Sequence, residues 1–308
     1  MKGPLFYAKI LLFGEYGIIK DSKGLAIPYN HYKGALQKAT KLNDSQKDSN
    51  KKLRAFYQYL TNLDSELVNF RLDELKEDVD ENMFFDSSIP QGYGVGSSGA
   101  LVAAIYDKYA DDKITVLENL TRDKLLHLKT IFATMESYFH GTSSGLDPLN
   151  SYLSIPILIN SKTDLEATGI PSQKEGKGAV FLMDSEQVGE TAPMVEIFMD
   201  KMKNEGFRKM ISEEFATHTD ACIHDFVKGD VKSLFGNVKQ LSKVVLGNFK
   251  PMIPQKFHNL WQAGLDSDDY YLKLCGSGGG GYFLGFTEDY AKTKEVLKNY
   301  KLELVYRF

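Results

Sequence analysis

The stretch PQGYGVGSSGAL, residues 90–101, concentrates residues that could do chemistry. Four of its residues are glycine: Gly92, Gly94, Gly96 and Gly99. Glycine loses more backbone entropy on folding than any other residue, so this composition indicates that bare backbone is needed. Successive N–H groups in a glycine turn form an anion-binding nest, and a helix that starts directly after it adds a positive dipole end. With the hydroxyls of Ser97 and Ser98, the stretch predicts a phosphate-binding loop.

Two other interpretations of this stretch stay open from its residues alone. Residues 94–99 satisfy G-x-G-x-x-G, the dinucleotide fingerprint, and Glu118 follows at a tolerable distance for the acid of such folds. Against this, the preceding segment carries Pro90 and lacks the near-continuous Val, Ile and Leu of a central parallel strand. The stretch could also be a structural turn with a serine as helix cap. No Gly-Lys-Ser/Thr follows, which excludes a P-loop.

Three charged residues elsewhere fit phosphoryl transfer, which needs a nucleotide cradle, a metal ligand, a positioned base and positive charge nearby. Lys9 is a cation within an apolar run, Glu136 is a candidate metal ligand, and Asp147 lies in a glycine-flanked loop that could carry a base. Each has a structural alternative: a snorkelling lysine, a solvated helix residue and a turn former before proline. Their occurrence with a second glycine-rich loop, at 273–286, favours a phosphotransferase.

Two further patterns are not interpreted as sites. Residues 141–145 match G-x-S-x-G, but a nucleophile elbow needs a strand before it and a helix after it. A helix is expected before this segment and Pro148 follows closely, so Ser143 is not expected to be a nucleophile. Cys222 lies near two histidines without the spacing of a ligand cluster, and an ordinary helix is expected there.

Hydrophobic periodicity predicts the elements that must position these residues. The predicted strands are 5–13, 15–19, 66–75, 151–159, 179–185 and 302–308. The predicted helices are 53–63, 97–110, 121–141 with Thr121 as N-cap and Gly141 as its end, a series between 192 and 265, and one near 288–299. Strands and helices mix without strict alternation, which favours an α+β fold.

Length and composition limit the class of protein. The 308 residues predict about two domains, and a polar, glycine-rich run at 160–178 places the boundary near 170, giving domains 1–170 and 171–308. The net charge of −4 argues against nucleic acid as the main partner. No apolar run is long enough to predict a membrane span, no signal peptide is recognised, and only two cysteines occur, so a cytoplasmic protein is expected.

Three segments, in this order, resemble the motifs of the GHMP kinase family, which includes galactokinases, homoserine kinases, mevalonate kinases and phosphomevalonate kinases. They are AKILLFGEY (8–16), PQGYGVGSSGA (90–100) and KLCGSGGGG (273–281). Glu136 with HGTSSGLDPLNSYL (140–153) resembles the mevalonate kinase branch in particular. The resemblance implies a two-domain α+β fold, with an N-terminal domain like ribosomal protein S5 domain 2 and a ferredoxin-like C-terminal domain.

The resemblance also implies a reaction and its residues. The γ-phosphoryl group of Mg-ATP would pass to the hydroxyl of mevalonate, with Asp147 as catalytic base beside Lys9, and with Ser98 and Glu136 as magnesium ligands. The residues implied at the nucleotide are Gly92, Gly94, Gly96, Ser97, Ser98 and Gly99. Those implied at the substrate are Lys9, Glu15, Tyr16, Asp147, Gly276 and Ser277.

Three departures from the family pattern leave the acceptor open. Tyr16 stands where mevalonate kinases often carry histidine, Tyr7-Ala8 replaces the usual Pro-Gly before the strand lysine, and Gly99 replaces the usual alanine. Phosphomevalonate or a sugar is therefore an alternative acceptor. A dinucleotide-dependent oxidoreductase and a non-catalytic binding protein are the other hypotheses, and the three retained charged residues speak against the last. The oligomeric state is open, a homodimer included.

Overall fold

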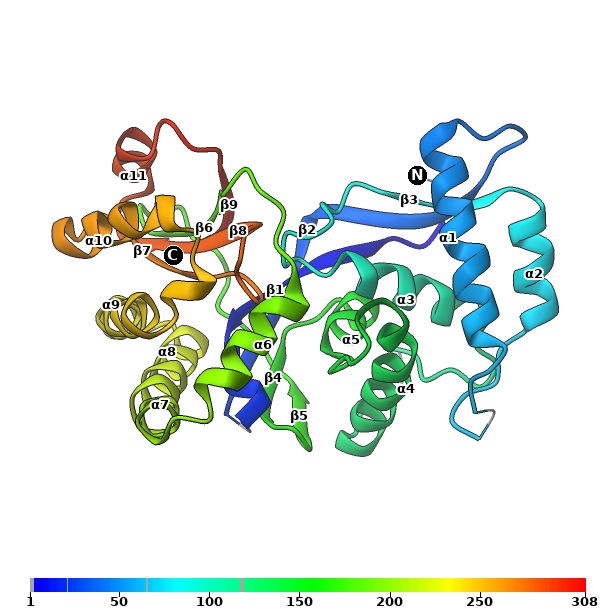
Figure 1. Cartoon of the computed structure of the whole chain (residues 1–308), viewed down its shortest axis with the longest axis horizontal. Coiled ribbons are helices and arrows are strands. Elements are labelled where there is room, and N and C mark those ends of the chain that lie inside the picture. Colours follow the sequence, from blue (N-terminus) through cyan, green and yellow to red (C-terminus); the bar gives the residue numbers. More distant parts are fainter. Residues whose placement is uncertain (1–2, 21, 65, 117–118) are drawn as a thin grey trace. The chain divides into compact units, whose positions relative to one another are not determined.

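The computed structural model describes residues 3–20, 22–64, 66–116 and 119–308 (Figure 1). The chain forms two compact units that interleave along the sequence. Unit 1 comprises the residues up to Lys9, 27–90 and 96–155, and unit 2 comprises 10–26, 91–95 and 156–308. Strands β1 (Phe6–Phe13) and β2 (Gly24–Lys38) therefore pass through both. The α+β class is confirmed, whereas the division of the chain at residue 170 stays a prediction.

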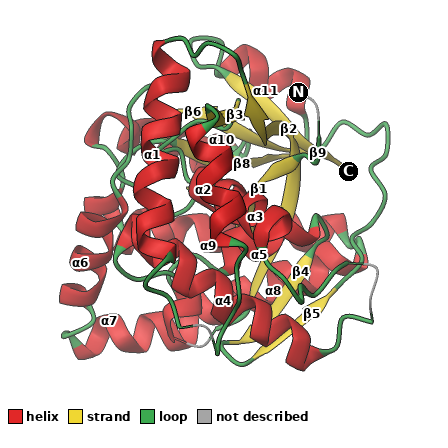
Figure 2. Ribbon diagram, turned by 90° about the vertical axis from the view of Figure 1, so that its right-hand side faces the viewer, coloured by secondary structure: helices red, strands yellow, loops and turns green. Residues whose placement is uncertain are grey.

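Unit 1 is mainly helical. Its helices are α1 (Asp44–Leu60), α2 (Leu72–Asp80), α3 (Ser97–Tyr109), α4 (Arg122–His140) and α5 (Leu146–Leu153). Strand β3 (Met83–Ser87) pairs antiparallel with β2, and α1 and α2 pack against each other and against β3 (Figure 2). Helix α3 packs on α4 and α5, and its run from Val102 to Tyr106 is buried. A helix that is apolar on nearly every side belongs inside a domain, which is why α3 lies at the centre of this unit.

Sequence periodicity was right for some elements of unit 1 and wrong for others. Thr121 caps α4 by accepting a hydrogen bond from a backbone N–H, and Gly141, with φ of 72°, ends the helix, as predicted. The strand predicted at 66–75 is wrong, because α2 begins at Leu72 and its buried residues recur at helical spacing. The strand predicted at 151–159 is wrong in its first part, since α5 continues to Leu153.

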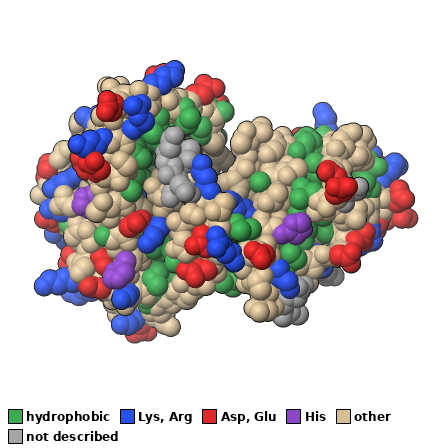
Figure 3. All heavy atoms as spheres, turned by 90° about the horizontal axis from the view of Figure 1, so that it is seen from below, with side chains coloured by type: hydrophobic (Ala, Val, Ile, Leu, Met, Phe, Trp, Pro, Cys, Tyr) green, Lys and Arg blue, Asp and Glu red, His purple; other side chains and the backbone are tan. Residues whose placement is uncertain are grey.

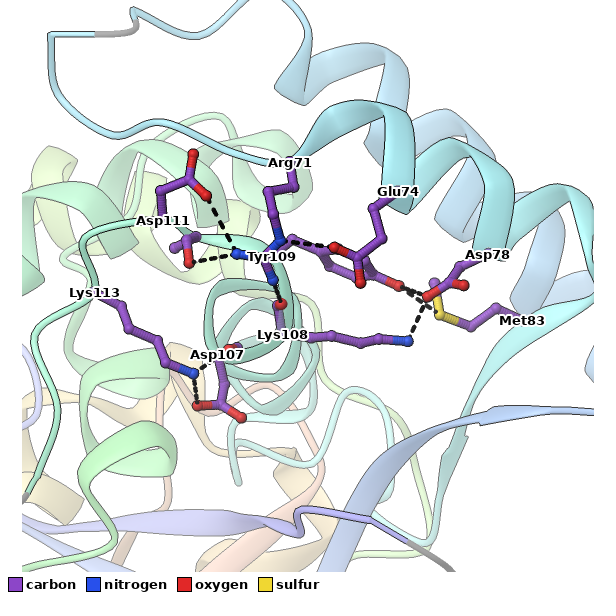
Figure 4. A network of polar contacts seen from close by, with 10 residues as sticks. Arg71, Glu74, Asp78, Met83, Asp107, Lys108, Tyr109, Asp111 and Lys113 are labelled. Carbon is purple, nitrogen blue, oxygen red and sulfur yellow. Dashed lines mark hydrogen bonds and ion pairs between the residues drawn. The ribbon is translucent and has the colours of Figure 1, made fainter.

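A polar network ties α2 to the C-terminal end of α3 (Figure 4). Asp78 on α2 is 8% exposed and accepts hydrogen bonds from Lys108 and from the hydroxyl of Tyr109, with Lys38 2.6 Å from its other oxygen. Burial raises the pKa of this carboxyl, but the hydrogen bonds from Lys108, Lys38 and Tyr109 outweigh it and hold the pKa at about 2. The network therefore anchors the end of α3 opposite to Ser97 and Ser98.

Unit 2 contains a four-stranded antiparallel sheet. Its strands, in spatial order, are β7 (Tyr271–Leu274), β8 (Tyr282–Thr287), β6 (Ala179–Asp184) and β9 (Leu302–Arg307). The hairpin of β4 (Ile157–Ser161) and β5 (Asp164–Ala167) pairs with the start of β2. The strands β6 and β8 are buried along nearly their whole length, which follows from their runs of Val, Phe, Leu and Met.

The helices of unit 2 complete a ferredoxin-like topology. Between β6 and β7 lie α6 (Thr191–Lys201), α7 (Glu205–Met210), the π-helix Ile211–Phe215, α8 (Ala216–Lys228), α9 (Val231–Asn248), two 3-10 turns (Lys250–Met252 and Gln255–Phe257) and α10 (His258–Ser267). Helix α11 (Tyr290–Val296) connects β8 to β9. The order strand, helices, strand, strand, helix, strand, with β6 beside β8 and β9, is the β-α-β-β-α-β arrangement. The predicted ferredoxin-like fold of the C-terminal region is confirmed.

The surface carries both signs of charge. Lys and Arg side chains are interspersed with Asp and Glu over the face shown in Figure 3, as expected from 37 basic and 41 acidic residues. Within the described ranges, none of the helices combines the length and apolar composition that crossing a bilayer requires.

Candidate active site

An ion pair between a strand and a helix end lies at the centre of the candidate site in unit 1. Lys9 on β1 is 5% exposed, and its Nζ lies 2.7 Å from Oδ1 of Asp147. Asp147 stands in the first turn of α5, where the helix dipole favours negative charge. Gly145 precedes this turn with φ of 73°, and a Cβ there would clash with the carbonyl oxygen of Lys129. The two residues predicted to be catalytic are thus brought together, and glycine at 145 permits the turn.

The N-terminal end of α3 packs directly on this ion pair. A Cβ added to Gly96, whose φ is 77°, would lie 3.0 Å from Cγ of Lys9 and 3.5 Å from Oδ2 of Asp147. One added to Gly99 would lie 2.7 Å from the backbone C of Asp147 and from the N of Pro148. The departure from the family's alanine at Gly99 therefore has a structural reason, because the backbone of α5 occupies the space of a methyl group.

The predicted metal ligands also lie together. Oγ of Ser98 donates to Oε1 of Glu136 at 2.8 Å, and Oγ of Ser143 donates to Oε2 at 2.5 Å. Glu136 is 4% exposed, and burial, with the charge of Asp147 adding to it, raises its pKa to about 7. The two serines and Lys9 act in the opposite direction. A hydroxyl beside a buried carboxylate is the oxygen donor set that Mg²⁺ prefers, and a bound cation would offset the cost of burying the charge.

The serine cap expected for α3 is not formed. The N-cap is Gly96, without a side-chain hydrogen bond, and the hydroxyl of Ser98 is directed to Glu136 instead. The backbone N–H groups of the first turn are therefore not capped by a serine side chain, which is the condition for binding an anion there.

Sequence reasoning missed two neighbours of the predicted metal ligands Ser98 and Glu136. His140, which is exposed, places Nε2 3.0 Å from Oγ of Ser98, and Ser143 was considered only as a nucleophile. The signal that could have found His140 was spacing, because residues four apart on a helix share a face and His140 follows Glu136 by four.

The hydrolase pattern at 141–145 is preceded by helix α4, so no elbow is formed. A helix does follow it, contrary to our expectation, because proline is tolerated in a first turn.

The second glycine loop, residues 276–281, packs in unit 2 against residues 92–94. A Cβ on Gly94 would clash with the carbonyl oxygen of Cys275, and one on Gly281 would lie 2.7 Å from Cα of Tyr93. Both glycines have positive φ, of 78° and 72°. The close approach of two backbones at these points explains why the two motifs are both rich in glycine.

Glu15 and Tyr16 also contact the region of the second glycine loop. The Glu15 carboxylate forms an ion pair with Lys273 on β7, and the two side chains are 6% and 2% exposed. The hydroxyl of Tyr16 donates to the carbonyl oxygen of Ser277 at 2.6 Å. The hydroxyl of Ser277 donates weakly to Oγ1 of Thr191, at 3.4 Å. Their assignment to the substrate, like that of Gly276 and Ser277, stays a prediction.

The dinucleotide hypothesis has little support in this geometry. The fingerprint belongs to a parallel βαβ unit, whereas β3, which precedes residues 94–99, pairs antiparallel with β2 and ends at Ser87. Glu118, the acid this hypothesis needs, lies outside the described residues.

The sequence comparisons identify part of the chain. Residues 58–154 match the family model described as the GHMP kinases N terminal domain. This segment includes α3, α4 and α5, and with them Ser98, Glu136 and Asp147. The search of curated proteins finds no match.

Solved structures are similar over nearly the whole chain. Mevalonate kinase of L. major, in complex with R-mevalonate, is 17% identical with a TM-score of 0.62, covering 97% of this chain and 91% of its own. Phosphomevalonate kinase of Streptococcus pneumoniae, with phosphomevalonate and AMPPNP, is 14% identical with a TM-score of 0.63, covering 99% and 100%. Galactokinase of Lactococcus lactis, complexed with galactose, is 11% identical with a TM-score of 0.61, covering 98% and 92%. At these identities the likeness shows the fold.

Proposed function

We propose that this chain is a GHMP kinase that transfers the γ-phosphoryl group of ATP to the hydroxyl group of mevalonate. The observation that carries the proposal is the Lys9–Asp147 ion pair, which packs against Gly96 at the start of α3. The mevalonate kinase-like run from Glu136 to Leu153 favours mevalonate among the acceptors that kinases of this fold bind. The proposal places the enzyme in the cytoplasm, in the synthesis of isoprenoid precursors.

Asp147 orients the acceptor hydroxyl and takes its proton. Its Oδ1 is held by Lys9, which leaves Oδ2, on the side of Gly96, for the substrate. The substrate oxygen bonds to the γ-phosphorus as the bond from that phosphorus to the bridging oxygen breaks, and ADP leaves with the electron pair. Lys9 stabilises the negative charge that develops on the substrate oxygen. A carboxylate is a weak base towards an alcohol, so positioning and electrostatics supply most of the rate.

The remaining residues of the site bind the nucleotide. In this proposal the backbone N–H groups of residues 92–99 and the hydroxyl of Ser97 hold the triphosphate. Ser98 and Glu136 would hold Mg²⁺, which when bound neutralises charge on the β and γ phosphates. The raised pKa of Glu136 fits this role, because a buried carboxylate that is costly to ionise alone gains from a cation beside it.

The acceptor is tested by measuring ADP release with Mg-ATP and a panel of mevalonate, phosphomevalonate, galactose and homoserine. We expect mevalonate to give the highest kcat/KM, by about tenfold or more over the others, since an acceptor that cannot be oriented at Asp147 loses most of the rate. Thermal unfolding with ATP or with NAD provides a control, because only a ligand of the folded state raises the melting temperature. Turnover of another acceptor with none of mevalonate would contradict the substrate assignment, and stabilisation by NAD alone would contradict the family of reactions.

Replacing Glu136 by glutamine is expected to stabilise the nucleotide-free protein while weakening its binding of Mg-ATP. With its pKa raised to about 7, the folded protein holds a proton between about pH 4.5 and 7 that the unfolded chain has released. The contribution of Glu136 to stability therefore falls as pH rises through this window. At pH 8 the variant should exceed the wild type by roughly 1–3 kcal/mol in the free energy of unfolding, and at pH 4 the two should be similar.

Urea unfolding at pH 4, 6 and 8 without metal measures this difference, and calorimetric titration with Mg-ATP measures the loss of binding. Glu213→Gln serves as the control, because that carboxylate is 62% exposed. A stability difference that does not change with pH would contradict the argument.

A further inference from the structure

A buried ion pair joins the turn that follows β1 to β7, the strand that precedes the second glycine loop. Glu15 and Lys273 are both nearly inaccessible, and Lys273 also donates to the carbonyl oxygen of Leu274 at 3.0 Å. A buried ion pair returns little stability, because its desolvation offsets the attraction between its charges. The pair instead fixes position. Separating Glu15 from Lys273 would leave a buried charge without its partner, so the pair holds the end of β7 in one place relative to the turn.

The next residue of the same turn reaches the loop itself. Tyr16 is 6% exposed, its hydroxyl donates to the carbonyl oxygen of Ser277, and its ring stacks on Phe198 with centroids 4.6 Å apart. Its φ is 57°, in the left-handed region that a bulky side chain rarely adopts. Such a conformation is unfavourable for a residue with a side chain and persists only where the surroundings hold it. The ring contact with Phe198 and the hydrogen bond to Ser277 thus fix the position of Tyr16 against the loop.

The loop that these residues hold packs in turn on the phosphate-binding segment. Within unit 2, Cys275 and Gly276 meet the backbone of Gly94. The backbone N–H of Tyr282, the first residue of β8, donates to the carbonyl oxygen of Tyr93 at 3.4 Å, and the centroids of the two tyrosine rings lie 4.9 Å apart. Contacts therefore run without interruption from the turn, through the second glycine loop, to residues 92–94.

We propose that Glu15, Tyr16 and Lys273 form a clamp that holds the second glycine loop against residues 92–94. They are positioning residues, acting on the nucleotide through the backbone of the loop rather than by touching the acceptor. The consequence for catalysis rests on the proposed function, whereas the clamp itself does not. The hydroxyl of Tyr16, at a position where mevalonate kinases often carry histidine, makes the hydrogen bond to the carbonyl oxygen of Ser277.

Hydrogen exchange of the amides of residues 276–281 tests the clamp without any assay of activity. Glu15→Gln and Tyr16→Phe should each raise the exchange of these amides by about tenfold, because each removes a contact that opposes local opening. Tyr270→Phe is the matched control, since that buried hydroxyl also donates to a carbonyl, of Leu260 at 2.8 Å, away from the loop. Glu15→Gln combined with Lys273→Met should raise the exchange of these amides by less than the product of the two single effects.

Steady-state kinetics then distinguish a positioning role of Tyr16 from direct contact with the acceptor. The clamp predicts that Tyr16→Phe raises the KM for ATP while the KM for the acceptor changes by less than about twofold, whereas direct contact with the acceptor predicts the reverse. Wild-type exchange at residues 276–281 in Tyr16→Phe and Glu15→Gln would overturn the clamp. If Glu15→Gln does not fold, Tyr16→Phe, which loses only a hydroxyl, decides alone. Faster exchange in a protein that phosphorylates no acceptor of the panel would support the clamp and refute the proposed function.

Discussion

Asp147→Asn is expected to lower kcat by about 10²–10⁴-fold while the affinity for Mg-ATP changes by less than about twofold. The amide cannot accept the proton of the acceptor hydroxyl, and it removes the negative charge that Lys9 holds at 2.7 Å. The residues proposed to bind the triphosphate are left intact, so the loss should appear in kcat rather than in nucleotide binding. Single-turnover kinetics and calorimetric titration with an ATP analogue measure the two quantities.

Asp107→Asn is the matched control for this variant. Asp107 also pairs with a lysine in unit 1, with Nζ of Lys113 2.9 Å from its Oδ1, and its side chain is 26% exposed compared with 32% for Asp147. We expect near wild-type turnover from this control. An Asp147→Asn protein that is folded and turns over within about threefold of the wild type would rule out Asp147 as the base.

Gly99→Ala, which introduces the residue usual in the GHMP kinase motif, is expected to lower both the stability and the turnover of this protein. The added Cβ would lie 2.7 Å from backbone atoms of Asp147 and Pro148, which cannot move as the tip of a flexible side chain can. Overpacking of this kind costs about 1–3 kcal/mol, against which alanine gains up to about 1 kcal/mol in helix propensity. Because the clash displaces Asp147 itself, kcat should fall by roughly 10–100-fold.

Gly236→Ala separates the clash from the effect of alanine in a helix. Gly236 lies within α9, and a Cβ there would meet nothing within 4 Å. This control should raise the free energy of unfolding by up to about 1 kcal/mol and leave kcat unchanged. Urea unfolding and steady-state kinetics on both variants provide the comparison. A Gly99→Ala protein with higher stability and full activity would show that α5 is free to move away from α3.

The sequence was sufficient to predict the parts of the fold that depend on short-range patterns. The strand that carries Lys9 and the helix that carries Glu136 with its caps follow from periodicity and capping residues, which act over a few positions. The strand predicted at 15–19 is wrong, because Gly17–Lys20 form a 3-10 turn. Two other errors lie where two patterns compete. Residues 66–75 contain β-favouring residues, but helical spacing beyond Leu72 decides the structure. Likewise, Pro148 argued against a helix after residue 145, whereas it stands in the first turn of one.

By itself, the sequence determined the set of residues available for chemistry: two glycine loops, a lysine in a strand, and the carboxylates Glu136 and Asp147. Tertiary structure alone decided what surrounds each of them. It directed Ser98 to Glu136 instead of to a helix cap, buried Glu136 so that its pKa rises, and engaged Glu15 with Lys273 across 258 positions of sequence. The physical reason is that hydrogen-bond partners and desolvation depend on which distant segments pack together, and no local pattern of residues specifies that packing.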